Sequence, residues 1–284
     1  MPITIAIASI SSTLALLVAK SLLQQPDVRI RGSSSNISKI PDDLKSDSRI
    51  SLVQSDPYDT ETLRTLVRGC DMVHNMLLLL EQRNHKVLID LCEKEGVPRY
   101  IASDYTVEYR KLDPTDMVIN FFTNDIVAYL DTKLGVKGVH IMVGLLIETF
   151  IDLFDAWRPE ANELRYWGTG NEKLDFTSYQ TAAEYVAAVA LDPNASGFFK
   201  FRGDHKSMIE IANEIESVTG SRPFLKRNGP LVDFEKLLDG AGNMEQVAVD
   251  AQYFILTGKV SLGDDIDNAK YPSVKPEAFS VVLR

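Results

Sequence analysis

Short apolar runs alternate with segments of helical hydrophobic spacing along the first hundred residues. Ile3 to Ala8 is a continuous β-branched and apolar run, as in a strand buried on both faces of a parallel sheet, and helical spacing of Leu and Val follows from Thr13 to Leu23. The alternation implies right-handed crossovers and a doubly wound parallel sheet. Further strands are predicted at Val28 to Arg31, Ile50 to Gln54, Met72 to Leu80 and Arg99 to Ala102, and helices at Ile37 to Leu44, from the N-cap Asp59 to Val67, and at residues 81–95 before Gly96.

The second half of the chain continues with helical and strand patterns. They predict a helix at Phe121 to Leu134, a strand at Gly138 to Val143, an amphipathic helix at Thr181 to Leu191 and a helix at residues 207–219 ended by Gly220. We expect an α/β protein with a Rossmann-type domain over residues 1–150. A smaller C-terminal α/β substrate lobe would occupy mainly residues 151–284, with the helix at about 176–191 returning to the Rossmann domain.

Composition and charge argue against several classes of function. The formal net charge of -10 argues against a direct nucleic-acid partner, because phosphate neutralisation needs clustered Lys and Arg. Two cysteines without metal-type spacings predict neither a disulfide framework nor a metal site, and they suit a reducing cytoplasm. The apolar N-terminus lacks a basic region and reads as strand, turn and helix, and no span is long enough for a membrane helix. We expect a cytoplasmic monomer or homodimer.

Several stretches, in this order, resemble one family over nearly the whole chain. They are the turn and helix after the first strand, VQSDPYDTETLRTLVRGCDMV, GVPRYIASDY, VGLLIETF, RYWGTGNEKLDFTS, AAEYVAAV and DNAKYPSVKP. Together they resemble the NmrA-like and isoflavone-reductase-like branch of the atypical short-chain dehydrogenases. The resemblance implies an NAD(P)-binding Rossmann fold, with a substrate between the two lobes.

The phosphate-binding turn departs from this family. The family turn resembles G-x-x-G-x-x-G, and its three glycines fall at Ser9, Ser12 and Ala15 of this chain. Glycine there gives a tight turn, close approach of the backbone to a pyrophosphate and close packing of helix on strand. Serine adds a Cβ where positive φ or phosphate contact is needed. The hydroxyls, with Thr13, could instead donate to an anion at the helix N-terminus.

The residues available for proton transfer also differ from those of this family. In family members that reduce, the resemblance implies a lysine on the helix after a P-S-E-F segment. Here that helix carries Thr123, Asn124 and Asp125, so the lysine is absent. No Tyr-x-x-x-Lys pair replaces it, since Tyr105 is followed by Tyr109 and the nearest lysine is Lys111.

One segment favours a nucleotide. Arg31 with Ser33, Ser34 and Ser35 is what a site for a ribose 2′-phosphate would contain, because Arg and hydroxyl groups suit phosphate oxygens. The alternative interpretation is a polar surface turn. The cofactor prediction is therefore none or NADP(H).

Candidate catalytic residues follow the central strands. Ser103, Asp104 and Tyr105 lie just past a strand end, with Asp104 as a possible general base and Tyr105 as a hydrogen-bond donor, or they form a cap and turn. His74 ends the fourth strand and faces the crevice or is structural. His140 lies inside an apolar strand and has a less favourable position. By resemblance Glu148 would line the wall between the lobes and orient a substrate, or it faces solvent.

Three functions remain open. The first is an enzyme that performs a redox-neutral isomerisation, dehydration, cyclisation or pericyclic step on a small apolar natural product, because the glycine turn and the lysine are both lost. The second is an NADP(H)-dependent reductase of the isoflavone-reductase type. The third is an NmrA-like regulator that senses nucleotides.

Overall fold

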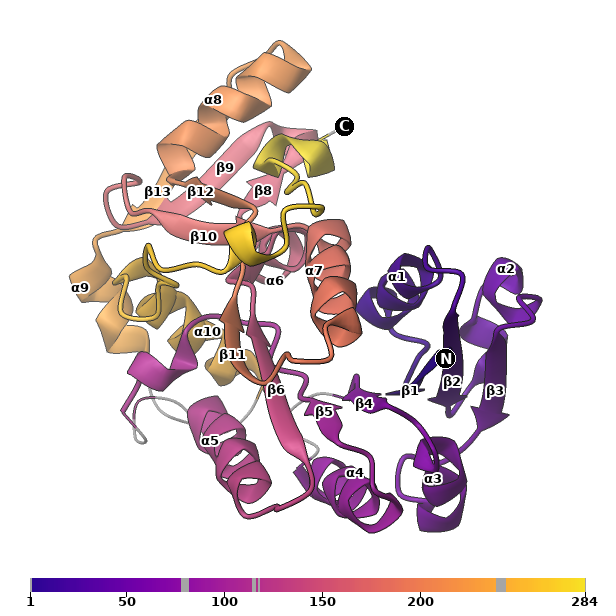
Figure 1. Cartoon of the computed structure of the whole chain (residues 1–284). Coiled ribbons are helices and arrows are strands. Elements are labelled where there is room, and N and C mark those ends of the chain that lie inside the picture. Colours follow the sequence, from indigo (N-terminus) through magenta and orange to yellow (C-terminus); the bar gives the residue numbers. More distant parts are fainter. Residues whose placement is uncertain (1, 78–81, 114–115, 117, 239–243, 284) are drawn as a thin grey trace. The chain divides into compact units, whose positions relative to one another are not determined.

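The computed structural model describes residues 2–77, 82–113, 116, 118–238 and 244–283. The chain forms two compact units that interleave along the sequence (Figure 1). The first unit comprises Met1–Asp104, Phe122–Ile141 and Ala183–Phe199, and the second comprises Tyr105–Phe121, Met142–Ala182 and Lys200–Arg284. The sequence predicts a boundary at residue 150, with the helix at about 176–191 returning to the first domain. The structure divides the chain at further points and has residues 183–199 in the first unit.

The first unit is built on a seven-stranded sheet in the order β11-β6-β5-β4-β1-β2-β3. All of the pairs from β3 to β6 are parallel, as the fold prediction requires. The chain order reverses between β1 and β4, which is where open α/β sheets bind ligands. The strands are β1 Ile3–Ala8, β2 Val28–Ser34, β3 Ile50–Gln54, β4 Met72–Asn75, β5 Arg99–Ile101, β6 Lys137–Met142 and β11 Gly197–Lys200.

Helices cover both faces of this sheet. Helices α3, α4 and α5 supply Leu66, Leu88 and Ile126 to a buried cluster that contains Val73 and Tyr100 of the strands. Figure 1 shows α1 on the opposite side of the sheet from α3 and α4. The helices of this unit are α1 Thr13–Leu22, α2 Asp42–Lys45, α3 Thr60–Val67, α4 Gln82–Glu95, α5 Val118–Asp131 and α7 Tyr179–Leu191. The first residues of α5 and α7 belong to the second unit.

Local signals account for the elements that the sequence predicts well. The apolar run of β1 is buried throughout from Ile5 to Ala8. Asp59 caps α3, as predicted, because its Oδ1 accepts the N–H of Thr62 at 3.2 Å. Gly96 follows α4 with a φ of +72°, a left-handed conformation that glycine adopts without strain.

Three predicted elements have different bounds in the structure. β2 continues to Ser34, so the serine-rich turn predicted after Arg31 is wrong and Ser33 and Ser34 belong to a buried strand end. β4 ends at Asn75, whose Oδ1 accepts the N–H of Leu77 and turns the chain, and residues 78–80 of the predicted strand lie outside the described residues. α5 begins at Val118 and ends at Asp131, three residues before the predicted bounds.

The second unit contains two three-stranded sheets, β12-β10-β7 and β13-β9-β8, and a phenylalanine-rich core. The ring of Phe176 lies edge-to-face against Phe150 and Phe279, with centroids 5.0 and 5.1 Å apart. Its strands are β7 Leu145–Leu146, β8 Trp157–Arg158, β9 Glu163–Trp167, β10 Leu174–Thr177, β12 Asp204–Lys206 and β13 Phe224–Gly229, and its helices are α6 Ile147–Leu153, α8 Met208–Thr219, α9 Leu231–Phe234 and α10 Met244–Leu256.

The described residues contain neither a membrane-spanning helix nor a cluster of metal-binding side chains. None of the helices there is long and apolar enough to cross a bilayer. Within the same residues, no group of three or more His, Cys, Asp or Glu side chains is arranged to hold a metal ion.

Candidate functional site

The turn after β1 keeps the backbone of a glycine turn. Ser9 has a φ of +61°, in the left-handed region that favours glycine. Serine at this position therefore carries the strain that the sequence predicts, of about 1–2 kcal/mol. The peptide N–H of Ile10 donates to Ser33 O at 2.9 Å, which joins the turn to the end of β2.

The second serine of the turn caps the following helix. Ser12 is the N-cap of α1, with extended backbone, and its Oγ accepts the N–H of Ala15 at 3.4 Å. An anion at a helix N-terminus would accept from the same N–H groups. The Ser12 hydroxyl thus accepts from one of the N–H groups that such an anion would use. Thr13 is the first residue of α1, and its side chain is exposed.

Side chains of the turn also pack against the end of β2. The Oγ of Ser34 donates to the Oγ of Ser11 at 2.8 Å and accepts the N–H of Asn36 at 3.1 Å. Ser33 and Ser34 are both buried. Ile10 is fully buried over Gly32, where a Cβ would come within 2.8 Å of its Cδ1. The Ser34 hydroxyl therefore has two partners within the protein, and its role in binding a ribose phosphate stays a prediction.

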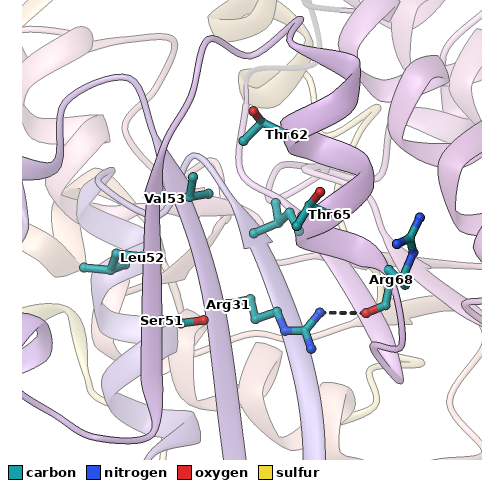
Figure 2. Close-up of a pocket in the computed structure, with 8 residues that line it drawn as sticks. Arg31, Ser51, Leu52, Val53, Thr62, Thr65 and Arg68 are labelled. Atoms are coloured by element: carbon teal, nitrogen blue, oxygen red, sulfur yellow. Dashed lines mark hydrogen bonds between the residues drawn. The ribbon is translucent and has the colours of Figure 1, made fainter.

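The side chain of Arg31 extends toward the C-terminal end of α3. Its Nη1 donates to the carbonyl oxygen of Arg68 at 2.6 Å, just past the C-terminal end of α3. Figure 2 shows the guanidinium between β3 and α3, beside Ser51 and Thr65. These residues line a cavity of about 460 Å³. Arg31 and Ser34 thus have separate partners, and a shared role in binding a 2′-phosphate stays a prediction.

The described residues fit a dinucleotide only in part. The backbone conformation at Ser9 and the N-terminus of α1 match the requirements of a pyrophosphate. The side chains do not, because Ser12 caps the helix, Ser11 and Ser34 bond to each other, and Arg31 is bonded to the chain after α3. We therefore derive no catalytic step from a bound nucleotide.

A buried polar network joins the end of β4 to the start of α4 and to β5. Asn75 Nδ2 donates to Asn84 Oδ1 and to Tyr100 Oη, both at 3.0 Å. Tyr100 Oη lies 2.9 Å from His85 Nδ1, and Asn84 Nδ2 donates to the Pro57 carbonyl in a short bond. Burial raises the pKa of Tyr100 well above its ordinary value. The network holds the end of β4 against α4 and β5 and was not predicted from the sequence.

His74 is buried at the end of β4, beside Ile7 and Ile101 of the neighbouring strands. Successive strand residues point to opposite faces, and Val73 packs with Tyr100 on the face covered by α4 and α5, so His74 lies on the other face. Desolvation lowers the pKa of His74 to about 3, which keeps the imidazole neutral near pH 7.

Asp104 forms a buried pair with His140 of β6. The Nδ1 of His140 and the Oδ2 of Asp104 are joined by a short hydrogen bond. Asp104 is 1% exposed and His140 is 3% exposed. The imidazole stacks on Phe198, with ring centroids 4.7 Å apart and planes at 20°. Such a carboxylate fixes the orientation and tautomer of the imidazole.

The other predicted residues near Asp104 have separate surroundings. Ser103 is half-buried, and Tyr105, also half-buried, begins the segment that belongs to the second unit. Lys111 donates to the carbonyl oxygen of Ser261 at 2.7 Å. Asp125, near the position of the family lysine, forms an ion pair with Lys86 at 2.6 Å.

Glu148 lies in the first turn of α6 and contacts the start of α7. Its two carboxylate oxygens accept the N–H of Tyr179 at 3.0 and 3.1 Å. A carboxylate at this position satisfies a free N–H and interacts favourably with the helix dipole. Burial raises the pKa of Glu148, against the lowering effect of these backbone hydrogen bonds. A substrate-orienting role for Glu148 stays a prediction.

Asp175 is a buried hub of the second unit that the sequence did not reveal. Its Oδ1 accepts from Arg202 Nη1 and His205 Nδ1, each at 2.8 Å, and its Oδ2 accepts from the Ser261 hydroxyl and the Leu262 N–H. Desolvation would raise the pKa of Asp175, but these donors together lower it. The hub ties β10 to the segment after α10 and is structural in character.

Comparison with known proteins agrees with this architecture. Residues 11–134 match the model of an NAD(P)H-binding family. The structure of an isoflavone reductase superposes with a TM-score of 0.84 at 16% identity, covering 100% of this chain and 99% of that one. A leucoanthocyanidin reductase–NADPH complex from Vitis vinifera gives 0.80 at 14% identity, with 99% and 98% coverage. An NADPH-dependent quinone oxidoreductase from Escherichia coli gives 0.72 at 17% identity, with 98% of each chain covered.

No curated protein sequence matches the chain. At these identities the structural likeness establishes the fold, and the family model covers the part of the chain from the turn after β1 to just beyond α5. The resemblance seen in the sequence is confirmed at this level. Residues 11–134 match the model of an NAD(P)H-binding family, and the whole chain has a fold like that of an isoflavone reductase.

Proposed function

We propose that this chain is an enzyme that converts a small, mostly apolar organic compound without net oxidation or reduction, on a scaffold shared with NADPH-dependent reductases. One observation carries the proposal: the hydroxyl groups of the nucleotide turn bind the protein itself. Ser12 caps α1, and Ser11 is bonded to Ser34. A pyrophosphate would have to displace the first bond, and a ribose phosphate would have to displace the second.

The absence of the family lysine supports the same conclusion. Reduction by a nicotinamide needs both a hydride donor and a proton donor. At the expected lysine position Thr123 is buried, and Asp125 is paired with Lys86. Isomerisation, dehydration and cyclisation need only orientation, positioned hydrogen-bond donors or bases, and exclusion of water.

A second candidate is an NADP(H)-dependent reductase. It is favoured by Ser9, whose positive φ preserves the backbone of a phosphate-binding turn. It is also favoured by two proteins of the same fold, a leucoanthocyanidin reductase in complex with NADPH and an NADPH-dependent quinone oxidoreductase. In that case the Ser12 hydroxyl would rotate away from Ala15 when the nucleotide binds. The long 3.4 Å bond between these residues makes such a rotation inexpensive.

Titration calorimetry with NADPH and NADH separates the two candidates. For the wild-type protein we expect dissociation constants weaker than about 1 mM for both nucleotides. The matched variant Ser9→Gly/Ser12→Gly restores two turn glycines, and we expect it to bind NADPH at least about tenfold more tightly. Micromolar binding by the wild type would overturn the proposal. An unchanged affinity in the glycine variant would show that the serines do not cause the weak binding.

A further inference from the structure

A hollow of about 280 Å³ lies on the face of the first sheet that α5 covers. Its aliphatic part comes from Val127 and Leu130 of α5, and its other walls include His140, Phe198 and Ser196. The volume is close to the lower limit of small-molecule pockets, roughly 300 Å³. The hollow is made entirely by residues of the first unit.

Gly138 forms the floor of this hollow beneath the His140 ring. A Cβ at position 138 would lie 2.9 Å from His140 Nε2 and 3.0 Å from Leu130 Cδ1. The φ of Gly138 is not in the positive range, so the backbone does not need glycine here. Glycine inside a strand weakens it and is typical of a place that another group approaches closely. Here the approaching groups are the His140 ring and Leu130, which occupy the space that a side chain at position 138 would take.

The two ring nitrogens of His140 therefore have different surroundings. Nδ1 is held by the buried carboxylate of Asp104, while Nε2 lies over Gly138 at the hollow. With Nδ1–H donating to Asp104, the lone pair of a neutral imidazole is on Nε2. A base that is oriented by a third group and lies in the wall of a pocket has the arrangement of a general base.

Two lysines, Lys133 and Lys137, also line the hollow. The ammonium of Lys133 is paired with Asp90 at 2.6 Å and lies over the Tyr129 ring. Lys137 begins β6 and is exposed. The hollow has an aliphatic wall and an aromatic ring beside one imidazole, and these fit the apolar part of a small compound. Asp131, Lys133 and Lys137 add charged groups to the same lining.

We propose that His140, oriented by Asp104, is the general base of this enzyme and that the hollow over Gly138 binds a small apolar compound with an acidic C–H next to a carbonyl group. This inference rests on the proposed redox-neutral function and deepens it. Nε2 takes the proton as the C–H bond breaks, and the electron pair moves into an enolate. The imidazolium, stabilised by Asp104, returns the proton to another carbon of the same compound. The product is an isomer, and no oxidant or reductant is consumed.

Modification with diethyl pyrocarbonate tests whether Nε2 is open. The reagent acylates neutral imidazole nitrogens, and peptide mass spectrometry resolves the four histidines of the chain. We expect His140 of the native wild type to be labelled, and Gly138→Ala to slow its labelling about tenfold or more, because the added methyl group crowds Nε2. Gly135→Ala is the matched control, since its Cβ would meet no atom within 4 Å. His205, whose side chain is 38% exposed, provides an internal reference rate.

A second measurement covers the case in which Gly138→Ala fails to fold. Nitrogen-15 NMR of the wild-type histidines reports the tautomer, and we expect a protonated Nδ1 and an unprotonated Nε2 in His140. Both measurements are made without nucleotide, so they succeed or fail independently of the calorimetry that tests the proposed function. An unlabelled His140 in the native wild type, equal labelling in Gly138→Ala, or a protonated Nε2 in the neutral ring would each overturn the inference.

Discussion

The hydroxyl of Ser34 donates a hydrogen bond of 2.8 Å to the hydroxyl of Ser11, and this bond joins the end of β2 to the turn after β1. From the sequence, Ser34 either binds a nucleotide phosphate or belongs to a polar surface turn. The structure has the same hydroxyl buried and bonded within the protein, with a second bond from the N–H of Asn36. Its stabilising role can be measured separately from any role in binding.

Replacement of Ser34 by alanine removes both of these hydrogen bonds from a buried position. We expect the free energy of unfolding to fall by about 1–2 kcal/mol, because buried partners lose their hydrogen bonds. Urea denaturation followed by circular dichroism measures this change. The control is Ser35→Ala at the next, exposed position, where we expect a change within about 0.5 kcal/mol. Equal losses in the two variants would contradict the role of the Ser34 bonds.

The two serines of the turn should respond oppositely to glycine. Ser9→Gly relieves a left-handed backbone and should stabilise the protein by about 0.5 kcal/mol, after the entropic cost of glycine. Ser12→Gly removes a helix cap and should destabilise it by a few tenths of a kcal/mol, and Ser12→Ala by about 1 kcal/mol. Guanidinium denaturation gives the three values. A loss of stability in Ser9→Gly would refute the conformation assigned to Ser9.

His74 should make the stability depend on pH. Burial lowers the pKa of His74 from 6.5 to about 3, so between these values the unfolded chain binds one proton more than the folded protein. The free energy of unfolding therefore falls as the pH falls through this window, by up to about 1.4 kcal/mol per pH unit. Denaturation at pH 7.5 and 5.5 should show a loss in the wild type that exceeds that in His74→Gln by about 1 kcal/mol. Parallel losses would indicate that His74 is not buried in its neutral form.

Glu148 should act on α7 through its hydrogen-bond acceptor. Glu148→Ala leaves the N–H of Tyr179 without this partner and should lower the free energy of unfolding by about 1 kcal/mol. Glu148→Gln keeps one acceptor oxygen and should lose less than half as much. Thermal and urea denaturation of both variants make the comparison. If the glutamine variant were as unstable as the alanine variant, the charge rather than the acceptor would be responsible.

Much of the first sheet could be predicted because its signals are local. The apolar run of β1, the Asp59 cap and Gly96 each act through neighbours a few residues away. The end of β2 was mispredicted for the opposite reason. Gly32, Ser33 and Ser34 have the composition of a turn, but pairing with the neighbouring strands β1 and β3 continues β2 through them.

The site could be predicted only in part, because its contacts join distant segments. Asp104 was identified from its place after a strand, but its partner His140 is 36 residues away. Their pairing depends on which face of β6 His140 occupies, and the apolar composition of β6 does not show this. The direction of Arg31 could not be predicted either, since its acceptor is the backbone carbonyl of Arg68.

The most direct test of the redox-neutral function is the mass of the product. The purified protein, without added nucleotide, is incubated with a small-molecule extract of its own organism and compared by mass spectrometry with His140→Asn. We predict that the wild type alone consumes a compound and forms a product of the same mass, or of that mass less one water. Consumption that requires added NADPH and yields a product heavier by two hydrogens would contradict the account.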